Sequence, residues 1–84
     1  MNRGVDSLPS AEQALTDIWN RASDQADVTA AADRIDAALR RDPLAVGESR
    51  AGQTRILIDS PLAVLYDVNP VRRTVLVWSV YRVS

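Results

Sequence analysis

The first regular pattern of apolar and polar residues lies between Ser10 and Asp24. Its apolar residues return every three or four positions, as one face of a helix requires: Ala11, Ala14, Leu15, Ile18, Trp19 and Ala22. Ser10 and Gln13 have the spacing of a capping box, and Pro9 stands just before them. We therefore predict a helix that begins at about residue 10 and turns Trp19 toward the protein core.

A second helical pattern follows and ends at the dipeptide Asp42-Pro43. Its apolar face consists of Val28, Ala31, Ile35, Ala38 and Leu39. Asp27 fits the N-cap position, and Pro43 biases Asp42 away from helical geometry, so the helix should end there. Only residues 23–26 separate the two patterns, which predicts an antiparallel helical hairpin. Its alanine-rich faces bury little area, so the hairpin needs a larger surface to pack on.

That surface is predicted by the second half of the chain, where apolar and polar residues alternate. After a linker from Leu44 to Gly52, strands are expected over residues 55–58, 62–68 and 74–83, with turns at Ser60-Pro61 and at residues 69–73. Strict alternation in the last strand places Val75, Val77, Ser79, Tyr81 and Val83 on one face and Leu76, Trp78, Val80 and Arg82 on the other. The predicted fold class is α+β: one domain over residues 1–84, with an N-terminal αα-hairpin packed on a three-stranded antiparallel β-meander.

Composition excludes several kinds of chemistry. The chain has neither cysteine nor histidine, so disulfides, thiolate catalysis and the commonest general base and metal ligands are missing. We expect no cofactor and no metal site. No apolar run is long enough for a membrane span, so a cytoplasmic protein is expected.

Charge is unevenly distributed along the chain. Residues 1–49 carry five arginines and nine acidic residues, a net charge of −4, while residues 50–84 carry five arginines and two acidic residues, a net charge of +3. The second half could meet a polyanion, or the charges could only solvate two surfaces.

Arginine and tyrosine residues of the predicted sheet are the candidate functional groups. Arginine holds phosphates through two hydrogen bonds, and tyrosine stacks on bases or exchanges a proton. The candidates for nucleic-acid or target binding are Arg55, Tyr66, Arg72, Arg73, Tyr81 and Arg82. Alternatively, these residues keep a sheet face soluble. We expect Arg55 and Arg82 together on the face opposite the helices, and no catalytic residue is identified.

The order of these elements, from about Ala11 to Arg82, resembles the RelE/ParE superfamily of type II toxin–antitoxin toxins. The resemblance rests on the stretches ALTDIW, LRRDP, VLYDV and TVLVWSVYR, and on Gly47 and Gly52. It implies a small toxin that a cognate antitoxin neutralises by folding on it. RelE-like members cut messenger RNA at the ribosome, and ParE-like members inhibit DNA gyrase. Arg55, Tyr66 and Arg82 match basic and tyrosine positions of the family.

The chain also departs from the family pattern. Ala63 stands where members often carry arginine before the tyrosine, and the family's first strand and C-terminal tail are expected to be reduced or absent here. The acidic balance weakens docking on ribosomal RNA. These departures favour a toxin that acts by binding its target, either gyrase-like or translation machinery. The alternatives are a ribosome-dependent mRNA endonuclease and a non-toxic interaction module; an exposed sheet edge would allow a homodimer.

Overall fold

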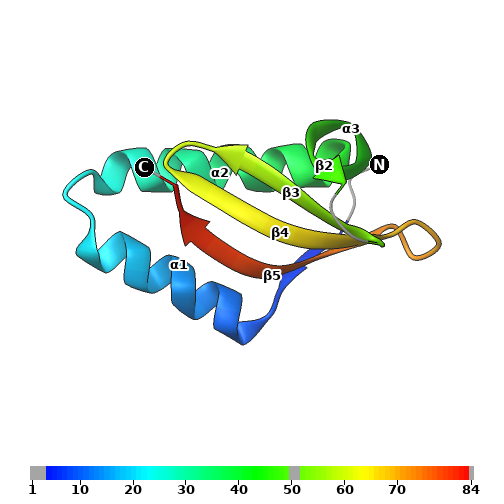
Figure 1. Ribbon diagram of the computed structural model, residues 1–84, viewed down its shortest axis with the longest axis horizontal. Coiled ribbons are helices and arrows are strands. Elements are labelled where there is room, and N and C mark those ends of the chain that lie inside the picture. Colours follow the sequence, from blue (N-terminus) through cyan, green and yellow to red (C-terminus); the bar gives the residue numbers. More distant parts are fainter. Residues whose placement is uncertain (1–3, 50–51, 84) are drawn as a thin grey trace.

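The computed structural model describes residues 4–49 and 52–83 and confirms the α+β class (Figure 1). In chain order the elements are β1 (Gly4–Ser7), α1 (Pro9–Arg21), α2 (Gln25–Arg41), α3 (Pro43–Val46), β2 (Glu48–Ser49), β3 (Thr54–Asp59), β4 (Leu62–Asn69) and β5 (Thr74–Arg82). The strands form one sheet in the order β1-β5-β4-β3-β2, in which β1 and β5 are parallel and all other pairs antiparallel. The predicted meander β3-β4-β5 is therefore the centre of a wider sheet.

The two outer strands are short, which explains why the sequence gives little sign of them. β1, the first strand that was predicted to be reduced or absent, is present and pairs with the first half of β5, from Gly4 opposite Thr74 to Ser7 opposite Val77. Val5, its one aliphatic residue, packs against the core. The predicted linker from Leu44 onward contains the helical turn α3 and the two-residue strand β2.

Both predicted helices form, but their starts differ from the prediction. Pro9 is the first residue of α1, Leu8 is the N-cap, and the capping box predicted at Ser10 is absent. Proline suits the first helical position because its missing N–H would have no partner there. α2 begins after Asp24 rather than after Asp27. Its predicted end at Asp42 is confirmed.

The core lies between α2 and the helix-facing side of the sheet. α2 crosses behind the strands, and α1 runs beside β5 (Figure 1). The core contains the predicted stripe of α2, except Ala38, which is only partly buried, and the inward residues of the central strands: Val28, Ala31, Ile35, Leu39, Leu62, Val64, Tyr66, Val68, Val75 and Val77. Among the described residues, no helix is long and apolar enough to cross a membrane.

Trp19 does not enter this core, contrary to the prediction. Its side chain is 42% exposed, and its indole Nε1 donates a hydrogen bond to Thr29 Oγ1 of α2 at 3.1 Å. Leu15 and Ile18 of the same helix pack against the core instead. The wide indole lies at the margin of the apolar stripe, where it bridges the two helices.

A β-bulge changes which residues of β5 face the helices. Val77 pairs with Tyr66 and Ser79 with Leu65, so Trp78 is an extra residue without a partner. Directly paired residues share a face, and Tyr66 faces the core. The strict alternation predicted for β5 is therefore wrong beyond Val77: Val80 and Arg82 lie on the helix side, and Ser79 and Tyr81 on the open side.

Candidate functional site

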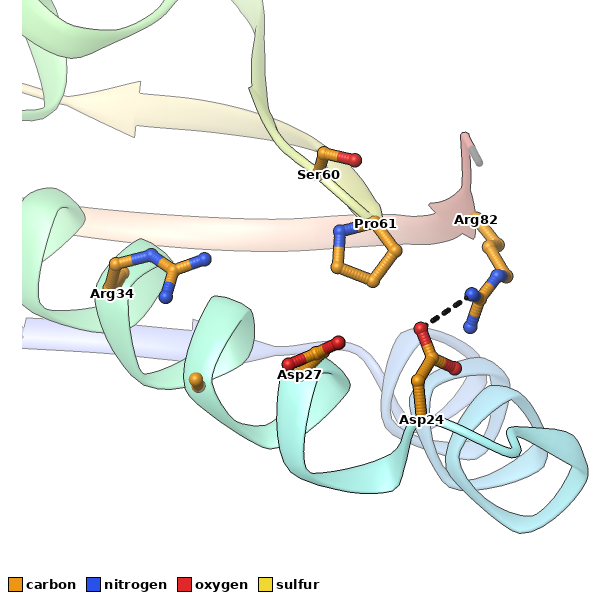
Figure 2. A pocket seen from close by; sticks show the side chains of 7 residues that line it. Asp24, Asp27, Arg34, Ser60, Pro61 and Arg82 are labelled. Carbon is orange, nitrogen blue, oxygen red and sulfur yellow. Dashed lines mark hydrogen bonds and ion pairs between the residues drawn. The ribbon is translucent and has the colours of Figure 1, made fainter.

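A pocket at one end of the molecule brings together charged residues from α2, with the residue just before it, and from β5. It lies between the start of α2, the β3–β4 turn and the end of β5, and its volume is about 380 Å³ (Figure 2). Its lining comprises Asp24, Asp27, Ala30, Arg34, Ser60, Pro61 and Arg82. We call it the Arg34–Arg82 pocket. The pairing of Leu62 with Arg82 explains its location, because the bulge turns Arg82 toward the helical hairpin.

Two ion pairs organise the pocket. Arg82 donates to Asp24 Oδ2 at 2.8 Å (Figure 2), and Arg34 donates two hydrogen bonds of 2.9 Å to the carboxylate of Asp59. The hydrogen bond from Arg82 lowers the pKa of Asp24, and that from Arg34 lowers the pKa of Asp59. Because both carboxyls therefore stay ionised at neutral pH, they are poor proton carriers. The pocket suits charge recognition rather than acid–base catalysis.

The Arg82–Asp24 ion pair is accessible to the charged groups of a binding partner. The two side chains are 36% and 31% exposed, and exposed ion pairs are weakly held. The second oxygen of Asp24, Oδ1, is buried and has no hydrogen-bond partner among the described residues. A partner's charged groups could therefore compete for either residue. Within residues 4–49 and 52–83, no cluster of three or more potential metal-binding side chains occurs.

The candidates Arg55 and Tyr66 lie at the opposite end of the sheet and hold α3 in place. Tyr66 is fully buried, and its hydroxyl donates to the carbonyl of Pro43 at 2.6 Å. Arg55 donates to the carbonyls of Leu44, at 2.9 Å, and Gly47. Burial raises the pKa of the Tyr66 hydroxyl, and the nearby Arg55 partly offsets this effect.

Arg55 and Arg82 therefore do not share the open face, and this prediction is wrong. Arg55 pairs with Tyr66 and Arg82 with Leu62, so both point toward the helix side, four residues apart along β4. Strict alternation could not place Arg82, because the bulge at Trp78 reverses its side.

The remaining candidates are exposed but separate. Arg72 and Arg73 occupy the loop that projects beyond the sheet (Figure 1), where the backbone N–H of Arg72 binds Asn69 Oδ1 at 3.1 Å and Arg73 adopts a φ of 57°. Tyr81 is 39% exposed on the open face. That face also exposes apolar side chains of Ile58, Leu76 and Trp78. Of the six candidates, only Arg82 lines the Arg34–Arg82 pocket.

Sequence reasoning overlooked the acidic half of this pocket and Arg34. Asp27 was interpreted as a helix cap, and neither Asp24 nor Arg34 was singled out as a functional residue. Their spacing carries a signal, because positions 24, 27 and 34 lie on one side of a helix, next to its apolar stripe. The partners Asp59 and Arg82 could not be inferred, because they come from distant strands.

Comparison with known proteins identifies the fold. No family model matches the sequence, and no curated protein is detectably similar to it. Solved structures are similar. The chain superposes on the RelBE2 toxin–antitoxin complex of Mycobacterium tuberculosis with a TM-score of 0.79 at 20% identity, covering 98% of this chain and 99% of that one. It superposes on the chromosomal ParDE system of P. aeruginosa with a TM-score of 0.74 at 13% identity, covering 98% of this chain and 97% of that one. On the isolated E. coli RelE toxin the TM-score is 0.65 at 16% identity, with 98% of this chain and 85% of that one covered.

Proposed function

We propose that this chain, which has the fold of the RelE and ParE proteins, is the toxin of a type II toxin–antitoxin module. The observation that carries the proposal is the superposition on a chain of a RelBE complex over almost the full length of both chains. The isolated RelE toxin superposes as well, which supports the toxin role rather than the antitoxin role.

The proposed mode of action is binding to a target, either gyrase-like or part of the translation machinery. Three features support binding over RNA cleavage. The chain contains no histidine, the hydroxyl of Tyr66 is buried in the core, and the carboxyls of Asp24 and Asp59 have lowered pKa values. The proposed contact residues are Arg82 in the pocket and, at separate exposed places, Tyr81 on the open face and Arg72 and Arg73 in the loop between β4 and β5.

The proposed partner is a cognate antitoxin, and the proposed site of action is the cytoplasm. Several similar structures are toxin–antitoxin complexes, which supports such a partner. A homodimer through a sheet edge has less support, because the outer strands β1 and β2 are only four and two residues long.

Expression in cells tests the proposal. Induction of the chain alone should arrest growth, and co-expression of its cognate antitoxin, sought among the neighbouring open reading frames, should restore it. Arg82→Ala should weaken the arrest, whereas the control Arg21→Ala, at the exposed end of α1, should not. Circular dichroism must show that both variants are folded. Normal growth with abundant, folded wild-type protein would refute the toxin role.

Assays with purified components then test the mode of action. We expect inhibition of gyrase supercoiling or of cell-free translation without cleavage of the message. Asp24→Ala tests whether Arg82 contacts the target itself, because this change removes the Arg82–Asp24 ion pair and keeps the Arg82 side chain. Message cleavage that disappears in Arg82→Ala would overturn binding and establish the endonuclease alternative.

A further inference from the structure

The open face of the sheet, which lies opposite the helices, is almost uncharged. Directly paired residues share a face, and the register of β3, β4 and β5 places nine side chains on it: Thr54, Ile56, Ile58, Ala63, Leu65, Asp67, Leu76, Ser79 and Tyr81. The bulge residue Trp78 is exposed beside them. Asp67 is the one charged residue in this set, and Thr54 Oγ1 donates to its Oδ1 at 2.8 Å. A face without a cation in these strands does not suit a polyanion.

Four large side chains form the exposed apolar part of this face. Ile58 is 56% exposed, and the exposed fractions of Leu76, Trp78 and Tyr81 lie between 37% and 39%. Ala63, which pairs with both Ile58 and Tyr81, is fully buried, so the apolar surface is continuous across the three strands. Tryptophan and tyrosine are the residues that most often anchor protein interfaces. The face therefore suits an apolar protein surface.

A second copy of this chain supplies a surface of matching character. Both faces are apolar and nearly neutral, so neither buries an unpaired charge when they meet. Sheets pack face to face about 10 Å apart, with their strands nearly aligned. A two-fold axis perpendicular to the strands would place β5 over β5 in the opposite direction. Trp78, the middle residue of β5, would then contact its own equivalent near the axis.

The charges at the ends of the sheet favour this axis over one parallel to the strands. Arg72 and Arg73 lie in the loop that projects from one end, whereas the β3–β4 turn forms the other end (Figure 1). An axis parallel to the strands would bring the two loops together and place four arginines side by side. The perpendicular axis puts the loops at opposite ends of the dimer, so like charges stay apart.

The size of the face sets the strength of the contact. Three strands about 4.8 Å apart and about six residues long, at about 3.3 Å per residue, cover roughly 300 Å² in projection. Even with the flanking strands included, each copy would bury less than the roughly 800 Å² per partner of a standard stable interface. The dimer should therefore be weak and half-formed at a concentration on the order of 100 µM.

We propose that the open face pairs with the open face of a second copy, around a two-fold axis perpendicular to the strands and close to Trp78. In this arrangement Tyr81 of one copy packs against Leu76 of the other. The inference goes beyond the proposed function and does not depend on it, because it concerns the chain alone.

Analytical ultracentrifugation of the full chain from 5 µM to 1 mM tests the association. The average mass should rise toward twice the monomer mass. Ile58→Lys puts a charge on the most exposed of the four apolar side chains and should abolish the association, whereas the control Leu44→Lys, at a residue that is 50% exposed on α3, should not. If Ile58→Lys does not fold, Ile58→Thr keeps a β-branched residue in the strand and should weaken the association at least fivefold.

Two further measurements locate the contact. The chain has two tryptophans, so in Trp19→Phe the emission comes from Trp78 alone, and it should shift to shorter wavelength as the concentration rises. The chain has no cysteine, so single cysteines report on proximity. Under oxidation Ser79→Cys, close to the axis, should form a disulfide-linked dimer faster than Val71→Cys, at the 90% exposed tip of the loop.

Four results would overturn the proposal. A monomer at 1 mM would remove the dimer, and association that Ile58→Lys leaves unchanged would remove the open face as its contact. Emission of Trp78 that does not depend on concentration would have the same meaning. Faster cross-linking of Val71→Cys than of Ser79→Cys would refute the perpendicular axis.

Discussion

Replacing Tyr66 by phenylalanine tests whether this residue serves the core or a target. The substitution keeps the buried ring and removes only the hydroxyl that donates to the Pro43 carbonyl at 2.6 Å. In the variant that carbonyl loses its buried partner. The free energy of unfolding should fall by about 1–3 kcal/mol, the usual cost of leaving one buried polar group unpaired. For a domain of this size, the melting temperature should drop by roughly 5–15 °C.

The measurement is urea unfolding followed by circular dichroism, with Tyr81→Phe as the matched control. Tyr81 lies on the open face and is 39% exposed, so the control should change stability by less than about 0.5 kcal/mol. Equal stability of the two variants would refute the reasoning. If Tyr66→Phe were as stable as the wild type yet lost growth arrest, Tyr66 would act on the target rather than on the fold.

The remaining predictions concern backbone fit and pH. Gly47→Ala should lower the free energy of unfolding in urea by more than about 2 kcal/mol, because the new Cβ would overlap the buried Tyr66 hydroxyl. In the control Gly4→Ala the new Cβ meets nothing closer than 3.8 Å, so stability should be nearly unchanged. Equal effects of the two substitutions would contradict this reasoning. The pKa values of Asp24 and Asp59 are lowered in the folded protein, so the two carboxylates stabilise the fold above the ordinary titration range of aspartate, near pH 4. The melting temperature should decline as pH falls through and below that range. In Asp24→Asn this decline should be less steep. An unchanged slope in that variant would count against the ion pair. Burial raises the pKa of Tyr66 in the folded protein, so the unfolded chain loses the hydroxyl proton at a lower pH than the folded one. The free energy of unfolding should therefore decline as pH rises above about 10. In Tyr81→Phe, where Tyr66 is the remaining tyrosine, tyrosinate absorbance should develop only above that pH. If Tyr66 in the folded Tyr81→Phe protein formed tyrosinate at the same pH as an exposed tyrosine, its hydroxyl would be accessible to solvent and this prediction would be wrong.

The sequence by itself determined the two long helices, the three central strands and their order, but not β1, α3 or β2. Both helices follow from three- and four-residue spacing, the central strands from alternation, and the turns from Ser60-Pro61 and Asn69-Pro70. These signals are local, because burial of one face of a helix or strand leaves a short-range pattern. The buried stripe of α2, from Val28 to Leu39, was predicted for the same reason.

Only the tertiary structure decided which side chains meet. One unpaired residue, Trp78, reverses the second half of β5 and turns Arg82 toward Asp24, which lies 58 residues away in sequence. Strand register depends on contacts between distant segments, so no local pattern carries it. Trp19 likewise lies outside the core, because Leu15 and Ile18 already pack there. The Arg34–Arg82 pocket arises from such long-range packing.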